Sequence, residues 1–420
     1  MNASGFLNSL VNYEKTTGYD YDFDGFRKFL SHLHDPHQRL SNTVQIAGTK
    51  GKGSVAALLQ AGLKTCKFRV GLFTSPHLST VHERIRIDDK NITESELRTY
   101  LERIKPYIKK RHRARTYFEV LTAVAFLHFI KKNTDINILE TGLGGRLDST
   151  STTRPIITAI TKIGYDHQNL LGTTLPEIAK EKAGIIKSGV PLVLTRQRPS
   201  AARILERTAQ KKGAPLAYSD TYHSIRIIEI DHRSTKVHVR GRLGDFTVRL
   251  PLIGRHHAEN LSLTLAILCE LRDLGFRLPL RNIIEGIKTV RLRGRFDVVS
   301  KDPYIIFDCA HNHESYEALY TTIHDIGIKK FRLIFGTSEE KDFRYCMKNI
   351  VPLAQEVILV RADHPRAVRP EYLARQFHSY NKNIIIAGSM TNALEYIRAH
   401  SRSRQPAIIT GSFYLWQAEW

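Results

Sequence analysis

The sequence has few cysteines, and their spacing suggests neither a disulfide framework nor a metal site. Cys66, Cys269, Cys309 and Cys346 are scattered over 420 residues. There is no C-x-x-C pair and no His-rich neighbourhood at the spacing of a zinc site. We therefore expect four reduced cysteines that behave as small buried residues.

Long apolar runs are also missing. No stretch is long enough to span a bilayer, and the opening "MNASGFLNSLVNYEK" lacks the basic start and the apolar block of a secretion signal. Hydrophobic residues at 42% and charged residues at 25% are typical of a soluble globular protein. These features predict a cytoplasmic protein without membrane contacts, and the length predicts two or three domains.

Acidic residues are in deficit. The chain has 63 Lys and Arg against 41 Asp and Glu, a net charge of +22, which suits either nucleic acid or small anionic substrates. The densest basic run, "KPYIKKRHRARTY" at residues 105–117, has no interleaved aromatic platform, so we interpret it as a solvated helix end and loop. The positive charge motivates one functional hypothesis, a nucleic-acid-dependent P-loop ATPase. This hypothesis predicts that DNA or RNA stimulates ATP turnover and that salt weakens the binding of the nucleic acid.

Short apolar strands alternate with helical patterns in the first part of the chain. The strand-like runs are "TVQI", "RVGLF", "INILE", "IITAITKI" and "VPLVL", and the helical ones include "FEVLTAVAFLHFIKK" and "EIAKEKAGIIK". This alternation predicts a mainly parallel sheet covered on both faces. Between residues 216 and 250 the pattern changes to two-residue alternation, which predicts a small antiparallel sheet at the edge of this domain.

A second α/β alternation starts near Val290, with strand-like runs such as "YIIFDCA", "FRLIFGT", "EVILVRA" and "AIITGS". The fold class is therefore α/β, with an N-terminal P-loop ATPase domain at 1–289 and a C-terminal Rossmann-like domain at 290–420. Ligands of open α/β sheets bind beyond the carboxyl ends of the strands. We expect such an edge to carry Asp308, His311, Gly336, Gly411 and Ser412, and we expect an active site in a cleft between the domains.

The stretch "VQIAGTKGKGSVAALLQ" combines an apolar strand, a glycine-rich turn and a helix. The usual phosphate loop has four residues between its first glycine and the Gly-Lys pair, whereas two separate Gly48 from Gly51 and Lys52. The parts that bind phosphate are nevertheless present. Glycines let backbone N–H groups approach phosphate oxygens, Lys52 can reach the terminal phosphates, and Ser54, after Gly53, can bind magnesium. The alternative is a tight strand-to-helix turn without a ligand.

Three further segments place polar groups just after apolar strands. Ser75 follows "GLFT", Glu140 ends "INILE", and Asp166 and His167 follow "TKIGY". A hydroxyl, a carboxylate and an imidazole at one edge beside a phosphate loop would make a magnesium site. Taken singly, Glu140 could be a helix cap and His167 a surface residue.

The helical pattern "EIAKEKAGIIK" carries a lysine on its apolar side. At about 100° per residue, Lys182 shares an arc with Ile178 and Ile185, while Lys180 and Lys187 point the opposite way. An inward-facing lysine is costly unless it is paired, metal-linked or chemically altered. Snorkelling or a simple ion pair is the alternative.

The second half places Arg295 in "GRFDVV" and Asp308, His311 and Asn312 in "IIFDCAHNHES". Arginine suits phosphate, aspartate suits ribose or amine groups, and a loop at a strand end suits a ligand. Ordinary loop capping is the alternative.

Taken together, the motifs resemble those of the folylpolyglutamate synthases, ATP-dependent folate ligases of the Mur ligase superfamily that in many bacteria also act as dihydrofolate synthases. The resemblance rests on "AGTKGKGS", "SPHL" with "ERIRI", "TYFEVLTAVAF", "ILETGLGGRLD", "DHQNLLGTTLPEIAKEKAGIIK", "GRHHAEN", "GRFDVV", "DCAHN" and "TGSFYL". It covers nearly the whole chain in order.

The resemblance implies a role for each matching position. The residues implied in binding ATP are Gly48, Thr49, Gly51, Lys52, Gly53, Ser54, Asn260, Arg295 and Asp308. Those implied in holding magnesium are Ser54, Ser75, Glu140, His167 and Lys182, the last as a carbamylated lysine that supplies oxygen to a second ion. Lys52, Lys182 and His311 are implied in catalysis, and His311 and Ser412 in binding glutamate.

The implied reaction joins L-glutamate to a reduced folate or to dihydropteroate. The substrate carboxylate attacks the γ-phosphate of ATP, and the glutamate amine then attacks the acyl phosphate to give an amide. Lys52, Arg295 and magnesium would neutralise charge on the transferring group. We expect pterin contacts in variable loops and in "TTGYDYDFDGF", residues 16–26, and we expect a monomer without a nucleic-acid partner.

A cell-wall Mur ligase is the rival within this class. It would need a nucleotide-sugar-binding domain before the P-loop, and 47 residues precede Gly48. Three departures from the family pattern stand out: Lys50 where the family commonly has Asn, "LDSTSTTRP" without the usual Asn, and "AHNHES" without the usual Pro. All three fall in loops around the expected site.

Overall fold

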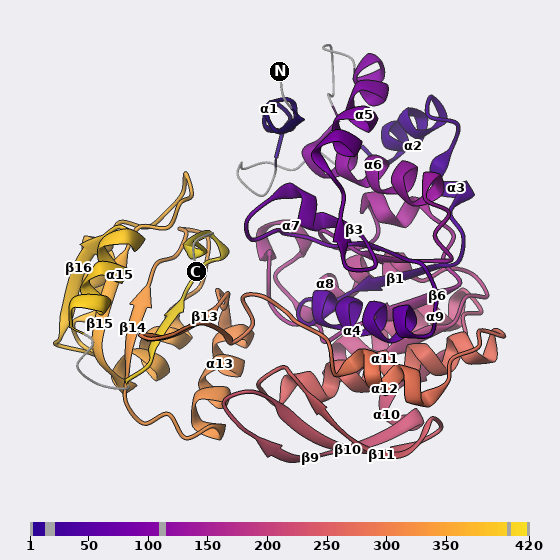
Figure 1. Cartoon of the computed structure of the whole chain (residues 1–420). Coiled ribbons are helices and arrows are strands. Elements are labelled where there is room, and N and C mark those ends of the chain that lie inside the picture. Colours follow the sequence, from indigo (N-terminus) through magenta and orange to yellow (C-terminus); the bar gives the residue numbers. More distant parts are fainter. Residues whose placement is uncertain (1–2, 13–21, 109–114, 401–404, 418–420) are drawn as a thin grey trace. The chain divides into compact units, whose positions relative to one another are not determined.

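The computed structural model describes residues 3–12, 22–108, 115–400 and 405–417 (Figure 1). The chain divides into two compact units. The first comprises Met1–Arg226, Val237–Val248 and Ala258–Val290, and the second comprises Ile227–Lys236, Arg249–His257 and Arg291–Trp420. Within the described ranges, no helix combines the length and the apolar character needed to cross a membrane.

The first unit is built on an eight-stranded sheet with the order β4-β3-β2-β5-β1-β6-β7-β8. Strands β2, β5, β1, β6, β7 and β8 are parallel, and β3 and β4 form an antiparallel edge. The central strands are wholly buried and mostly apolar, as expected where helices cover both faces. The bounds are β1 Thr43–Ala47, β2 Val70–Phe73, β3 Ile85–Ile87, β4 Lys90–Asn91, β5 Ile136–Glu140, β6 Ile157–Ile160, β7 Leu192–Leu194 and β8 Leu216–Tyr218.

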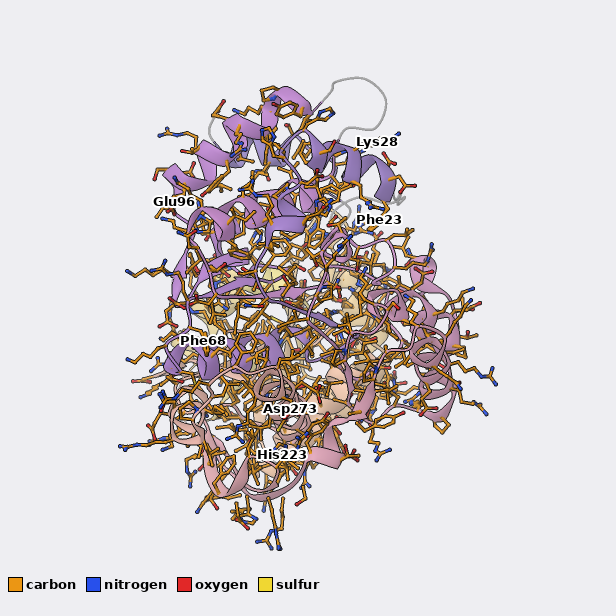
Figure 2. The ribbon with its side chains drawn as sticks, turned by 90° about the vertical axis from the view of Figure 1, so that its right-hand side faces the viewer. Phe23, Lys28, Phe68, Glu96, His223 and Asp273 are labelled. Carbon is orange, nitrogen blue, oxygen red and sulfur yellow. The ribbon has the colours of Figure 1, made fainter. Side chains whose placement is uncertain are left out.

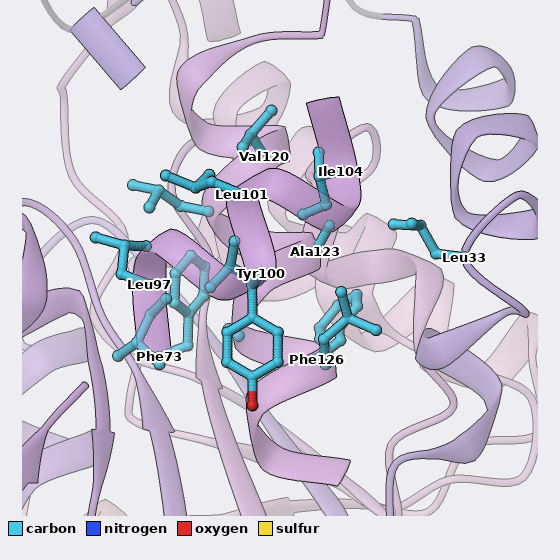
Figure 3. Packing of buried hydrophobic residues seen from close by; sticks show 14 of the residues in the cluster. Leu33, Phe73, Leu97, Tyr100, Leu101, Ile104, Val120, Ala123 and Phe126 are labelled. Atoms are coloured by element: carbon cyan, nitrogen blue, oxygen red, sulfur yellow. The ribbon is translucent and has the colours of Figure 1, made fainter. Parts of the chain in front are cut away.

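Helix α6 (Tyr117–Lys131) forms much of the core on one side of this sheet. It starts at a capping box in which Thr116 and Glu119 exchange hydrogen bonds of 2.8 and 3.2 Å. Phe73 of β2 and Tyr100 of α5 (Glu94–Ile104) pack against it, as Figure 3 shows. The other helices around this sheet are α1 Ala3–Asn8, α2 Phe23–Ser31, α3 Pro36–Arg39, α4 Lys52–Thr65, α5 Glu94–Ile104, α7 Gln168–Leu171, α8 Leu175–Lys182, α9 Pro199–Lys211, α10 Ser219–Tyr222, α11 His256–Asp273 and α12 Leu280–Ile287.

A three-stranded antiparallel sheet has the order β11-β10-β9, with bounds β9 His223–Ile230, β10 Thr235–Gly241 and β11 Gly244–Leu250. Two sets of hydrogen bonds hold the turn between β10 and β11, which belongs to the first unit. Arg242 donates to the carboxylate of Asp273 at the end of α11, and the Leu243 N–H donates to Nε2 of His223, 3.1 Å away; Asp273 and His223 are labelled in Figure 2. The predicted antiparallel region was too long, because β8 at residues 216–218 pairs in parallel with β7.

The second unit contains a six-stranded sheet with the order β12-β13-β17-β14-β15-β16. All neighbours are parallel except β12, which lies antiparallel to β13. The strands are β12 Asp297–Lys301, β13 Tyr304–Asp308, β14 Phe331–Phe335, β15 Ala354–Val360, β16 Ile384–Gly388 and β17 Ala407–Thr410, and the helices α13 His313–Asp325, α14 Pro370–Phe377 and α15 Met390–Ala399. The mixed α/β fold class is confirmed, whereas the domain limits 1–289 and 290–420 stay a prediction.

Two sequence predictions fall partly on residues that the structure does not describe. These are residues 13–21 within and before the expected pterin-contacting stretch, and residues 109–114 of the basic run. The described start of that run forms the 3-10 turn η2 (Lys105–Tyr107) directly after α5, which agrees with a helix end. Of the four cysteines, all are free and three are buried, as expected, while Cys66 is half-buried.

Candidate functional site

The glycine-rich turn joins the carboxyl end of β1 to the start of α4. Gly48 has φ 142° and Gly51, the N-cap of α4, has φ 88°. A Cβ on Gly48 would lie 1.8 Å from Oγ1 of Thr161, and a Cβ on Gly51 would lie 2.3 Å from Oδ1 of Asn260. The turn therefore needs glycine at both positions. The same geometry brings the side chain of Asn260 against the turn.

The segment after β6 is hydrogen-bonded to this turn. The N–H of Thr49 donates to the Lys162 carbonyl at 3.0 Å, and the Thr49 hydroxyl bridges the N–H and the carbonyl of Gly164 at 3.0 and 3.2 Å. Lys50 pairs with Asp166 at 3.2 Å. These bonds place Asp166, and with it His167, beside the turn.

Two lysines converge on one carbonyl oxygen in the turn. Nζ of Lys52 donates to the oxygen of Gly48 at 3.1 Å, and Nζ of Lys182 donates to the same oxygen at 2.9 Å. Lys182 ends α8 and is only 4% exposed. Burial, reinforced by the nearby charge of Lys52, lowers the pKa of Lys182 to about 7. The prediction that Lys182 faces inward is confirmed.

The expected orientation of Lys187 was wrong. Helix α8 ends at Lys182, so Lys187 lies beyond it and no longer follows helical spacing. Its side chain is half-buried and donates to the Ser151 carbonyl at 2.8 Å. Burial lowers the pKa of Lys187 to about 8.

Glu140 and Ser75 meet next to the start of α4. Glu140 is the last residue of β5 and is 5% exposed, and the Ser75 N–H donates to its Oε2 at 3.2 Å. A Cβ on Gly53 would lie 3.5 Å from the same oxygen, and Ser54 is buried one residue further along α4. Hydroxyl and carboxylate oxygens are the donors that Mg²⁺ prefers, so this set fits magnesium.

His167 is the N-cap residue of α7 with φ 50°, and its Nε2 lies 3.8 Å from Oδ1 of Asp166. Across the described ranges there is no group of three or more His, Cys, Asp or Glu side chains that could hold a metal ion. A cation at this edge would therefore depend on hydroxyl, phosphate or modified lysine oxygens in addition to Glu140.

Sequence reasoning missed Asp148, which organises the glycine-rich turn after Glu140. Its fully buried carboxylate accepts hydrogen bonds from the N–H groups of Gly142, Leu143 and Thr150 at 2.9 to 3.0 Å and from the Thr150 hydroxyl at 2.6 Å. Burial raises the pKa of Asp148, and the hydrogen bonds oppose that rise. An acidic residue directly after "GLGGRL" was the signal that could have found it.

The second unit gathers its own predicted residues at the carboxyl ends of β13 and β17. Asp308 accepts from the N–H groups of Phe296 and Ala310, both at 2.8 Å, which holds the loop carrying Arg295 beside the strand end. Nδ1–H of His311 donates to the carbonyl of Cys309 at 2.7 Å.

Phe413 links the remaining residues of this group, and sequence reasoning missed it. The Arg295 guanidinium lies 5.1 Å from the centre of its ring and the His311 ring lies 5.4 Å from it. Ser412 directly precedes it and accepts from the Tyr414 N–H at 3.2 Å. An aromatic residue directly after the strand-end Gly-Ser of "TGSFYL" was the available signal.

The chain matches two protein-family models. The Mur ligase middle domain matches residues 46–268, and the Mur ligase glutamate ligase domain matches residues 294–413. A probable bifunctional folylpolyglutamate synthase/dihydropteroate synthase of Haloferax volcanii is 30% identical over 98% of this chain and 49% of that protein. The chain thus spans about half the length of this relative and of a similar one from Halobacterium salinarum. A dihydrofolate synthase/folylpolyglutamate synthase of Mycobacterium tuberculosis is 31% identical over 80% of this chain and 74% of the relative.

Solved structures agree over nearly the whole chain. M. tuberculosis folylpolyglutamate synthase complexed with ADP superimposes with a TM-score of 0.88 and 27% identity, covering 98% of this chain and 95% of that one. E. coli FolC in complex with DHPP and ADP gives a TM-score of 0.87 and 26% identity, covering 99% and 96%. The chain therefore belongs to the Mur ligase superfamily and, within it, to the folylpolyglutamate synthase/dihydrofolate synthase family.

Proposed function

We propose that this protein is an ATP-dependent ligase that joins L-glutamate to the carboxylate of a reduced folate or of dihydropteroate through an acyl phosphate. The observation that supports this most is the convergence of Lys52 and Lys182 on the Gly48 carbonyl, beside Glu140. That arrangement combines cations for phosphate with oxygens for magnesium at one strand edge. The relatives named above carry the matching activities and include complexes with ADP and DHPP.

The nucleotide phosphates bind along the glycine-rich turn and the start of α4. In the first turn of α4 the backbone N–H groups have no acceptor within the helix, and the helix dipole adds positive charge. The proposed nucleotide contacts are Gly48, Thr49, Gly51, Lys52, Gly53, Ser54, Asn260, Arg295 and Asp308. Lys52 and Arg295 neutralise charge on the phosphoryl group as it transfers.

Magnesium is held by Ser54, Ser75, Glu140 and His167, and when bound it neutralises charge on the phosphates. Lys182 is carbamylated in this proposal. Its lowered pKa leaves a large neutral fraction near pH 7, so the amine nitrogen can bond to the carbon of CO₂ with loss of a proton to solvent. The carbamate replaces a costly buried cation by an oxygen donor for a second ion.

Glutamate is oriented by His311 and Ser412. Because Nδ1–H of His311 donates to the Cys309 carbonyl, the neutral ring keeps its lone pair on Nε2. That nitrogen can accept a hydrogen bond from the amino group of glutamate. His311 thus orients the incoming nucleophile.

The test is glutamate-dependent ADP release by the purified protein, with tetrahydrofolate and with dihydropteroate in parallel. Turnover with both establishes a bifunctional enzyme, and turnover with tetrahydrofolate alone restricts it to tail extension. No turnover with either contradicts the proposed substrates.

The protein is also proposed to act as a cytoplasmic monomer without a nucleic-acid partner. Light scattering during size-exclusion chromatography measures the oligomeric state. ATP hydrolysis that rises on adding RNA or DNA and falls steeply with salt would favour the alternative ATPase.

A further inference from the structure

The loop between β2 and β3 is closed on itself. At its base, the N–H of Thr74 donates to the carbonyl of Arg84 at 3.0 Å. Inside it, the carboxylate of Glu83 accepts from the N–H groups of residues 78–80 at 3.0, 2.9 and 2.8 Å. A loop fastened both at its base and at its centre holds its side chains in fixed directions.

Arg84 is among the largest fully buried side chains described, with 1% exposure. Its guanidinium lies 5.3 Å from the centre of the Tyr117 ring, at the start of α6. Its Nε–H donates to Nδ1 of His77 at 2.7 Å. Because arginine carries only donors, Nδ1 of His77 must present a lone pair.

This bond fixes the tautomer of His77. A neutral imidazole that accepts at Nδ1 carries its proton on Nε2. The two ring nitrogens face different directions, so the Nε2–H is directed away from Arg84. His77 is therefore held as a hydrogen-bond donor.

The loop borders the proposed active site. Ser75, two residues before His77, bonds to Glu140. In the order β2-β5-β1, the loop after β2 lies two strands from the glycine-rich turn after β1, or about 10 Å. An oxygen that attacks the γ-phosphate has to approach in line with the departing ADP, and the loop after β2 is near enough to the turn to hold the group that carries this oxygen.

We propose that the Nε2–H of His77 binds an oxygen of the carboxylate substrate and that Arg84 is the positioning residue that keeps His77 in this tautomer. The inference rests on the proposed function. A neutral N–H can orient a carboxylate without neutralising its charge, which leaves the other oxygen nucleophilic toward ATP.

Two substitutions of His77 separate binding from packing. The amide of Asn reaches the place of Nδ1 and keeps an acceptor for Arg84, whereas the amide of Gln reaches the place of Nε2 and keeps a donor for substrate. We expect His77→Asn to raise KM for the folate substrate about 10-fold or more, the cost of one hydrogen bond to a charged group, with KM for ATP unchanged. His77→Gln should retain more turnover. Equal kinetics of the two variants, or a rise in KM for ATP instead, would overturn the proposal.

The positioning role is tested with Arg84→Lys, and Arg86→Lys is the matched control on β3. Arg86 is half-buried two residues further along. We expect Arg84→Lys to lower kcat/KM about 10-fold alone and to add little when combined with His77→Asn, because both changes interrupt the same contact. Additive losses would show that Arg84 acts through packing. Arg86→Lys should combine additively.

The tautomer is read directly by ¹⁵N NMR of histidine-labelled protein at pH 8, with the His77 signals assigned by their absence in His77→Gln. A proton on Nδ1 would overturn the assignment. If the wild-type protein releases no ADP with glutamate, the proposed function and this inference fall together. If it does, and all His77 and Arg84 variants match it, only the inference falls.

Discussion

The two units end their parallel strands in polar edges that are stabilised in opposite ways. At the edge of the first unit, Lys52 and Lys182 share one carbonyl oxygen, and Lys182 is almost fully buried. At the edge of the second unit, Asp308 is held by backbone N–H groups of its own loop and of the loop that carries Arg295, and His311 is held by the Cys309 carbonyl. The first edge concentrates positive charge, and the second fixes the positions of groups that are already hydrogen-bonded.

This difference shows at which edge a bound ligand stabilises the protein most. A buried amine with a pKa near 7 destabilises the fold in its charged form, and such perturbed groups gather where function requires them. An anion or a carbamate at the first edge would remove that cost. At the second edge the polar groups are already hydrogen-bonded, so a ligand there relieves little of such a cost. The protein instead supplies the orientation of these groups.

The largest effect is expected from Lys182→Ala. If a carbamate on Lys182 is required, this variant should lose at least about 100-fold in ligase rate, and added bicarbonate should not restore it. Its free energy of unfolding should not fall, because a buried amine that is costly to charge has been removed. Lys180→Ala is the control, since Lys180 is exposed on the same helix. A Lys182→Ala variant of near wild-type rate would contradict the carbamate proposal.

The next largest effect is expected on stability, when one glycine at each edge is replaced by alanine. Gly411 has φ 116°, and a Cβ there would lie 2.3 Å from the Gly336 carbonyl, which belongs to the backbone and cannot move aside. Gly51 has φ 88°, and its Cβ would meet the side chain of Asn260, which can rotate. We expect Gly411→Ala to lower the free energy of unfolding by about 3 kcal/mol and Gly51→Ala by about 1 to 2 kcal/mol.

Urea unfolding measures these losses. Gly213→Ala is the control for backbone strain alone, because Gly213 has φ 57° and nothing lies within 4 Å of its added Cβ. Gly51→Ala should also raise KM for ATP. Equal stability losses for Gly411→Ala and Gly213→Ala would mean that the Gly336 carbonyl does move.

Acid should weaken both units through buried histidines. Burial lowers the pKa of His128, in the first unit, to about 4, and burial with His256 and Arg295 nearby lowers the pKa of His257, in the second unit, well below 6.5. Between these values and 6.5 the unfolded chain binds more protons than the folded one, so stability falls as the pH drops from 6.5 toward 4 and is level above 6.5 with respect to these groups.

Urea unfolding at pH 7.5 and pH 5 measures this loss. His128→Gln and His257→Gln should each reduce the difference between the two pH values. Both ring nitrogens of His257 are buried without a hydrogen-bond partner in the described part of the chain. For His257→Gln, the change in stability at pH 7.5 therefore reports packing, and the further change at pH 5 reports the charge of the histidine. If the loss of unfolding free energy between pH 7.5 and pH 5 is the same in both variants as in the wild type, other groups cause the acid sensitivity.

Features that depend on the spacing of neighbouring residues could be predicted from the sequence. The inward direction of Lys182 follows from helical periodicity, and the error at Lys187 follows from the end of α8, where Gly184 approaches the backbone of Arg146 too closely for any Cβ. Strands β4 and β12 were missed because both are edge strands without an apolar run: "KN" is two exposed polar residues, and "DVVSK" is only half-buried.

The site residues that sequence reasoning missed depend on contacts across the chain. The ring of Phe413 matters because Arg295, more than a hundred residues earlier, lies against it. No local pattern contains that information. The glycine-rich turn could be predicted because its strand, its glycines and its helix are consecutive.

The smallest effect is expected at Lys50, where the family commonly has Asn. Lys50 pairs with Asp166 at 3.2 Å with 29% of its side chain exposed, and such pairs contribute less than about 1 kcal/mol. Lys50→Asn should therefore keep its stability. Lys50 is nevertheless one of the cations that lower the pKa of Lys182, so its removal should raise that pKa and reduce the neutral amine at pH 7. We expect ligase activity to fall by at most about threefold at pH 7 and to recover at pH 8.5. A pH-independent loss would mean that Lys50 binds ATP itself, and the first edge would then hold a third cation aimed at the nucleotide.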